Sequence, residues 1–180
     1  MEVRIHGRGG QGTVKAAEII VRTSVMDGKY GVSIPFFGFE RQGAPVTAFV
    51  RLSDRPIRPK TRVYHPDCVI VMDAFLLENV DVFSGLRDGS TVILNAPGPV
   101  EGLQFPACVA RVGIVDATGI ALEALGRNIP NTAMLGAFCA VTRAVPLEGL
   151  AACAAEALGE KNAEAAQRGY SQVVTTSLVS

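Results

Sequence analysis

The hydrophobic residues of this chain follow two periods, one typical of strands and one typical of helices. Short apolar runs predict strands at 3–6, 30–34, 46–52, 68–73, 91–95 and 108–112. Apolar positions three or four residues apart predict helices at 13–26, 75–80, 117–125, 131–144 and 147–168. Strands that alternate with helices favour a largely parallel sheet covered on both faces.

The middle of the chain predicts that part of the sheet is antiparallel. Turn residues follow the strand at 46–52, in the run Ser53-Asp54-Arg55-Pro56, and suggest a hairpin-like reversal with antiparallel pairing. No repeat and no flexible linker divides the chain, so we expect one domain over residues 1–180. The predicted fold is α/β, a three-layer α/β/α sandwich with a mostly parallel, mixed sheet and an almost purely helical carboxyl third.

The amino-acid composition and charge exclude several classes of protein. The chain has 180 residues, of which 48% are hydrophobic and 19% charged, which is typical of a protein with a sizeable core and not of a disordered one. Seventeen Lys and Arg balance seventeen Asp and Glu, so we expect neither nucleic acid nor an anionic membrane as a partner. The sparse charge indicates surfaces that are buried between subunits.

The residues that usually hold metals do not cluster. Four cysteines lie far apart with no CxxC pair, and the two histidines, His6 and His65, show no metal-binding spacing. We therefore predict no metal site, and thiols that act as small buried hydrophobes in a reducing cytoplasm.

The N-terminus shows no secretory signal pattern. No GxSxG elbow or Ser–His–Asp order is present, so no catalytic residue is predicted.

A glycine-rich loop is the first candidate binding site. The run Gly7-Arg8-Gly9-Gly10-Gln11-Gly12 follows a predicted strand and opens a predicted helix. Its N–H groups and the helix N-terminus suit a phosphate, and Arg8 and Lys15 favour an anion. The acid that would hold a ribose is missing, because Ser33, Ile34 and Pro35 occupy its place. The alternative is that these glycines only permit a tight turn and close packing.

A second candidate is the aromatic loop between the strands at 30–34 and 46–52. Phe36, Phe37 and Phe39 stand beside Glu40, Arg41 and Gln42. Exposed phenylalanines are unfavourable unless a partner covers them, so we favour a subunit contact and expect the isolated chain to self-associate. The alternative is that Arg41 acts as a bidentate ligand of a carboxylate or phosphate.

Two polar residues end predicted strands. Asp73 and Asn95 both stand at the carboxyl end of an apolar run, which is where open α/β sheets bind ligands. The alternative for both is a capping role at the start of the next element.

Several runs together resemble one family, the gamma subunits of the 2-oxoacid:ferredoxin oxidoreductases. The resemblance covers nearly the whole chain. It rests on the runs His6 to Gly12, Asp27-Gly28-Lys29-Tyr30, Phe37 to Val46, Asn131-Thr132-Ala133-Met134-Leu135-Gly136, Lys161-Asn162 and Arg168-Gly169-Tyr170.

The resemblance implies a cytoplasmic subunit of an enzyme that oxidatively decarboxylates a 2-oxoacid, makes an acyl-CoA and passes electrons to ferredoxin or a similar acceptor. It implies alpha, beta and delta-type partner subunits, which hold thiamine diphosphate, Mg and [4Fe–4S] clusters. This chain would bind no cofactor alone and would lie at the edge of the CoA site. Gly7, Arg8, Gly9, Gly10, Gln11 and Gly12 are then the candidate loop for the CoA phosphates.

The resemblance also makes Phe37, Glu40, Arg41 and Gln42 an interface or active-site loop. Members of the family commonly carry tyrosine at the position of Phe37 and arginine at that of Gln42. Both departures remove polar groups. If this loop touches substrate, CoA or a neighbouring subunit, they allow a preference other than that of a pyruvate enzyme, for example toward a branched or aromatic 2-oxoacid. Two alternatives stay open: a freestanding nucleotide-binding α/β module, and a purely structural scaffold subunit.

Overall fold

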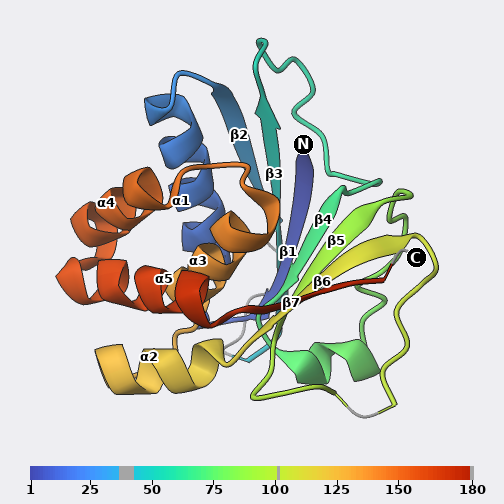
Figure 1. Ribbon diagram of the computed structural model, residues 1–180. Coiled ribbons are helices and arrows are strands. Elements are labelled where there is room, and N and C mark those ends of the chain that lie inside the picture. The colour runs from blue at the N-terminus through green and yellow to red at the C-terminus, as the bar shows by residue number, and fades with distance from the viewer. Residues whose placement is uncertain (37–42, 101, 179–180) are drawn as a thin grey trace.

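A computed structural model describes residues 1–36, 43–100 and 102–178, and the strands in these residues form one seven-stranded sheet in the order β2-β3-β1-β4-β5-β6-β7 (Figure 1). The strands are β1 (Glu2–Arg8), β2 (Tyr30–Phe36), β3 (Pro45–Ser53), β4 (Cys68–Val71), β5 (Ser90–Asn95), β6 (Val109–Val115) and β7 (Val174–Ser177). The helices are α1 (Thr13–Met26), the 3-10 helix η1 (Ala74–Glu78), α2 (Ala117–Leu125), α3 (Asn131–Thr142), α4 (Leu147–Leu158) and α5 (Glu160–Gln172).

The sheet is mixed, as predicted. Strands β1, β4, β5 and β6 run parallel to one another, while β3 is antiparallel to both β1 and β2, and β7 is antiparallel to β6. The parallel strands β4 and β5 are buried along their whole length, as expected for strands with both faces covered. The predicted antiparallel pairing of the region from 30 to 52 is confirmed.

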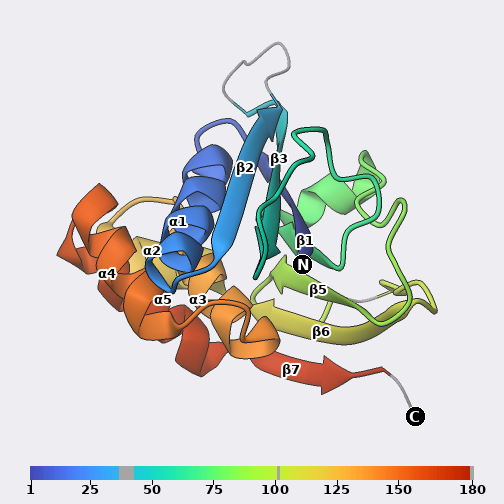
Figure 2. The same ribbon diagram turned by 90° about the horizontal axis from the view of Figure 1, so that it is seen from above.

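Helices α1 to α5 lie together on one face of the sheet, and η1 with irregular segments covers the other (Figures 1 and 2). The main core lies on the helical face and includes Ile5, Ile20 and Phe138. A smaller cluster around Val69 and Leu94 fills the opposite face. The three layers are therefore unequal, because the chain between β4 and β6 forms only short turns of helix.

Three details differ from the sequence prediction. The helix expected at 147–168 is two helices, α4 and α5, because the chain turns at Gly159 with a φ of 98°. Strand β7 was not predicted, because its residues are all exposed and lack alternation. The reversal expected at 53–56 is not a hairpin, since β3 leads through an irregular segment to β4, which lies beyond β1.

The described helices contain none that is both long and apolar enough to cross a membrane.

Helix α3 is the centre of the helical layer. Most of its residues are buried, as expected for a helix that is apolar around its whole circumference. Two glycines allow α5 to approach it. A Cβ at Gly136 would collide with the carbonyl oxygen of Ala166, and a Cβ at Gly169 with that of Ala133. The two backbones therefore pack in direct contact at this crossing.

We expect Gly136→Ala or Gly169→Ala to lower the free energy of unfolding by about 3 kcal/mol, because the added methyl group meets backbone and cannot be accommodated by a rotamer change. Gly98→Ala is the control, since a Cβ there meets no atom within 4 Å. Chemical denaturation monitored by circular dichroism measures all three. Equal stability of the three variants would contradict the close crossing.

Candidate functional site

The glycine-rich loop connects β1 to α1, as predicted, and lies at the carboxyl edge of the parallel strands. Gly7 and Arg8 end β1, and Gly9 to Gly12 form the turn before α1. Several loop N–H groups are already used. The Arg8 N–H donates to Gln11 Oε1 at 2.7 Å, the Gly9 N–H to the Ala44 carbonyl at 2.9 Å, and the Gln11 N–H to the Arg8 carbonyl at 3.0 Å. These bonds connect the loop to itself and to Ala44.

Two of the loop glycines are needed for packing. A Cβ at Gly7 would collide with Thr13 Oγ1, and a Cβ at Gly12 with the side chain of Asn131 at the start of α3. Gly12 also has a φ of 77°, in the left-handed region that favours glycine. These contacts support the packing alternative for Gly7 and Gly12. They also bring the N-termini of α1 and α3 together.

Arg8 and Asp73 form an ion pair across the edge of the sheet. Arg8 Nε donates to Asp73 Oδ2 at 2.8 Å, and Gln11 Nε2 donates to the same oxygen at 3.3 Å. The second carboxylate oxygen of Asp73 accepts the Phe75 N–H at 3.0 Å, which caps η1. Arg8 Nη1 also reaches the Gly43 carbonyl at 3.2 Å. We call Arg8, Gln11 and Asp73 the edge clasp.

The edge clasp borders a cleft of about 750 Å³ over the carboxyl ends of β4, β5 and β6. Of the predicted loop residues, Gln11 lines this cleft, together with Asp73 and Asn95. Asn95 is fully engaged: its Nδ2 donates to the Met72 carbonyl and to Thr118 Oγ1, both at 2.8 Å, and its Oδ1 accepts the Thr118 N–H at 3.1 Å. It therefore fixes β5 to its neighbours.

Sequence reasoning missed part of the cleft. Asp116, Thr118 and Asn128 also line it, and Asp116 caps α2 by accepting the Gly119 N–H at 2.8 Å. Asp116 follows a predicted strand and precedes a predicted helix, which is the same signal that singled out Asp73. The described lining contains these two carboxylates and neither lysine nor arginine. The charge of the described lining is therefore negative, which disfavours an anion inside the cleft.

The aromatic loop cannot be compared with its prediction. Phe37, Phe39, Glu40, Arg41 and Gln42 lie outside the described residues. Phe36, at the end of β2, is described and is 38% exposed.

The cysteines are free and lie in or beside the core. Burial raises the pKa of Cys68 well above its usual range, and raises that of Cys139 to about 12. Both are therefore protonated thiols at neutral pH. Among the described residues, no group of three His, Cys, Asp or Glu side chains is arranged to hold a metal ion.

Comparison with known proteins identifies the family. The family model described as pyruvate ferredoxin/flavodoxin oxidoreductase matches residues 2–172. Pyruvate synthase subunit PorC of Methanothermobacter thermautotrophicus is 50% identical over 177 residues, covering 96% of each chain. The pyruvate/ketoisovalerate oxidoreductases common subunit gamma of Thermococcus kodakarensis is 48% identical over 184 residues, covering 99% of this chain and 100% of the relative.

A solved structure agrees. The crystal structure of pyruvate oxidoreductase subunit PORC from Thermotoga maritima is 34% identical, covers 98% of each chain and has a TM-score of 0.85. This chain therefore belongs to the pyruvate ferredoxin/flavodoxin oxidoreductase family. Within that family it is a gamma subunit of the PorC type, which confirms the resemblance inferred from the sequence.

Next to the loop, His6 is buried with a specific neighbour. Its Nε2 accepts a hydrogen bond from Arg4 Nε at 3.0 Å. Burial, and then the charge of Arg4, lower the pKa of His6 from 6.5 to about 3. The imidazole is therefore neutral in the folded protein. The unfolded chain binds a proton below about pH 6.5, so His6 destabilises the fold increasingly as the pH falls from 6.5 toward 3.

We expect His6→Gln, which keeps an acceptor for Arg4 but does not titrate, to reduce the loss of stability in this pH range. The slope it removes is up to about 1.4 kcal/mol per pH unit. Denaturation curves at several pH values measure it, with the exposed His65→Gln as the matched control. An acid dependence that is the same in His6→Gln as in the parent protein would show that His6 is not the group responsible.

Proposed function

We propose that this gamma subunit works in a multi-subunit enzyme that oxidatively decarboxylates a 2-oxoacid, transfers the acyl group to CoA and passes the electrons to ferredoxin or a similar acceptor. The observation that carries the proposal is the similarity over nearly the full length to gamma and PorC subunits, at 48–50% identity. Residues 1–180 act as one domain, consistent with a family model that spans residues 2–172. Four free cysteines suit a reducing cytoplasm.

We assign the cofactors of the enzyme to partner subunits. Thiamine diphosphate, with Mg, supplies the decarboxylation chemistry when bound, and [4Fe–4S] clusters carry the electrons. The described cysteines of this chain do not fit a cluster, because they lie in β4, in the turn before β6, in α3 and in α4, and two of them hold their protons strongly. Alpha, beta and delta-type subunits are the proposed holders. This chain contributes to assembly and to the CoA side of the active site.

The glycine-rich loop is the proposed contact with the CoA phosphates. Arg8 has a side chain that is 32% exposed, and the edge clasp and Gly43 use its Nε and Nη1. A guanidinium has five N–H donors, so it can hold a phosphate while it keeps these two bonds. The first turn of α1 contains no acidic residue, so its N-terminus also favours an anion, while Lys15 in that turn is paired with Glu18.

The identity of the 2-oxoacid is assigned to other subunits. The Thermococcus relative is named as common to pyruvate and ketoisovalerate oxidoreductases, so one gamma chain serves two acids there. By analogy, we propose that this gamma subunit does not select the acid alone. The loop with Phe37 and Gln42 remains the part of this chain that would adjust such a preference.

We expect Arg8→Ala to raise the Michaelis constant for CoA by about tenfold in the assembled enzyme, because a charge-assisted hydrogen bond to phosphate is lost. The Michaelis constant for the 2-oxoacid should stay unchanged. Steady-state assays of the complex, with each substrate varied in turn, measure both constants.

Asp73→Asn distinguishes two roles of Arg8, the binding of a CoA phosphate and the support of the glycine-rich loop. It weakens the edge clasp but leaves the Arg8 cation in place, so the Michaelis constant for CoA should not rise. A value for CoA that is unaffected by Arg8→Ala would overturn the phosphate assignment and favour the structural scaffold. An equal rise in both variants would mean that Arg8 only braces the loop.

A further inference from the structure

A strongly basic segment projects from the sheet and takes no part in the site described above. It consists of residues 54–62, between β3 and β4, and we call it the basic strap. Arg55, Arg58, Lys60 and Arg62 are all exposed, and Asp54 is its one carboxylate. Among the described residues, no ion pair neutralises these four cations. In a chain with no net charge, this concentration of positive charge is local.

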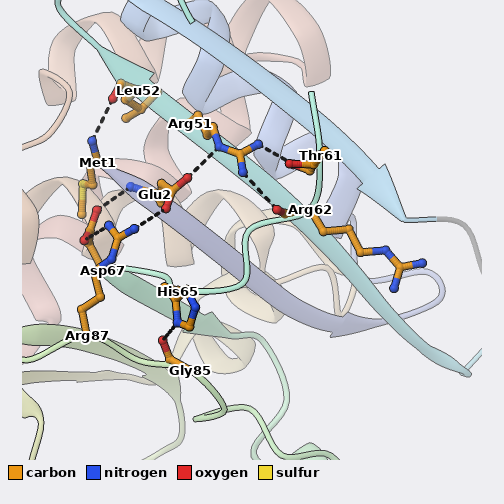
Figure 3. Close-up of polar contacts among 10 residues, drawn as sticks. All are labelled: Met1, Glu2, Arg51, Leu52, Thr61, Arg62, His65, Asp67, Gly85 and Arg87. Atoms are coloured by element: carbon orange, nitrogen blue, oxygen red, sulfur yellow. Dashed lines mark hydrogen bonds and ion pairs between the residues drawn. The ribbon is translucent and has the colours of Figure 1, made fainter. Parts of the chain in front are cut away.

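The basic strap is fixed to the sheet by a largely buried arginine (Figure 3). Arg51 on β3 donates from Nη1 to the Thr61 carbonyl and from Nη2 to the Arg62 carbonyl at 3.0 Å. Its Nε donates to Glu2 on β1 at 2.7 Å, and its side chain is only 10% exposed. The carboxyl end of the basic strap is therefore held to β3 by side-chain donors at Thr61 and Arg62.

A second set of bonds fixes the chain where it leaves the basic strap (Figure 3). Arg87 bridges Glu2 at 2.8 Å and Asp67 at 2.9 Å, and Asp67 also accepts the Glu2 N–H at 2.7 Å. His65 Nδ1 lies 3.2 Å from the Gly85 carbonyl. An ordered segment loses less conformational entropy when it binds than a free one does. The carboxyl end of the basic strap and the chain that follows it are thus held in place before a partner binds.

Aromatic residues lie beside the cations. The Arg62 guanidinium lies 3.6 Å from the centroid of the Phe36 ring, and Tyr64 is 67% exposed. These three residues line a hollow of about 280 Å³, whose other charged lining residues are Arg4 and Asp81. Arginine, tyrosine and phenylalanine are the residue types enriched in protein–protein interfaces. The combination of an aromatic hollow with a charged border is typical of such a surface.

The arrangement of charge favours a protein over a small anion. A phosphate site brings cations and backbone N–H groups to one point. Here the four cations are spread along an irregular segment, and Pro56 and Pro59 contribute no N–H donors. We propose that the basic strap, with the hollow beside it, docks an acidic surface of another subunit of the same assembly. This inference rests on the proposed function, which supplies the assembly.

The test uses the native assembly, captured through an affinity tag on this chain and washed at increasing salt concentration. Arg58→Glu combined with Lys60→Glu should reduce the partner chains retained at physiological salt by about tenfold, because attraction becomes repulsion. Retention of the partners by the wild-type chain should decrease with salt, and that dependence should be weaker in the variant. Mass spectrometry of the retained chains gives the readout.

Two control variants distinguish the effect of the position of the reversed charges from the effect of the change in net charge. Arg58→Lys with Lys60→Arg keeps both charges and should retain the partners as the wild type does. Arg127→Glu with Lys161→Glu reverses two exposed charges near α2 and α5 and should also retain them. Equal loss in this second control, or full retention in the basic-strap reversal, would overturn the proposal.

Two further outcomes would count against the proposed function and against the docking proposal, respectively. If the wild-type chain captures no partner chain at all, the proposed function itself fails. If it binds a labelled RNA oligonucleotide and the basic-strap reversal abolishes that binding, the basic strap serves nucleic acid and the docking proposal is wrong.

Discussion

The burial of α3 is the constraint on which the rest of this structure depends. A helix that is apolar on every side must be covered on every side, and here the sheet covers one side while α5 covers another through Gly136 and Gly169. This requirement gathers the helices α1 to α5 on one face of the sheet. It also brings the first residue of α3, Asn131, against Gly12 at the start of α1. The core therefore sets the position of the glycine-rich loop.

Two polar networks then extend from this core to opposite ends of the central strands. At the carboxyl end of β1, the edge clasp of Arg8, Gln11 and Asp73 holds the loop beside the cleft. At the amino end of β1, Glu2 joins Arg51 and Arg87, and Arg51 holds the carboxyl end of the basic strap. Both networks depend on contacts between residues far apart in sequence. One lies beside the proposed ligand site and the other beside the proposed docking surface, so the two proposed contacts lie at opposite ends of β1.

Much of the fold could be predicted because local pattern and tertiary structure agree. The helices at 13–26 and 117–125 have the predicted bounds, and the glycine-rich loop lies where strand and helix signals meet. Gly159 was overlooked because the alanine-rich periodicity continues across it. Strand β7 has no burial pattern of its own and depends on pairing with β6. The partner of Arg8 was not predictable either, since Asp73 is brought to it by the pairing of β1 with β4.

The most direct test of membership in such an enzyme is anaerobic purification of the native protein through a tag on this chain, followed by visible absorption and assays with a panel of 2-oxoacids. We predict that larger subunits copurify, that the preparation has the brown spectrum of iron–sulfur clusters, and that it oxidises a 2-oxoacid only when CoA is present. A colourless, solitary 18.9 kDa chain would contradict this account and favour a freestanding nucleotide-binding module.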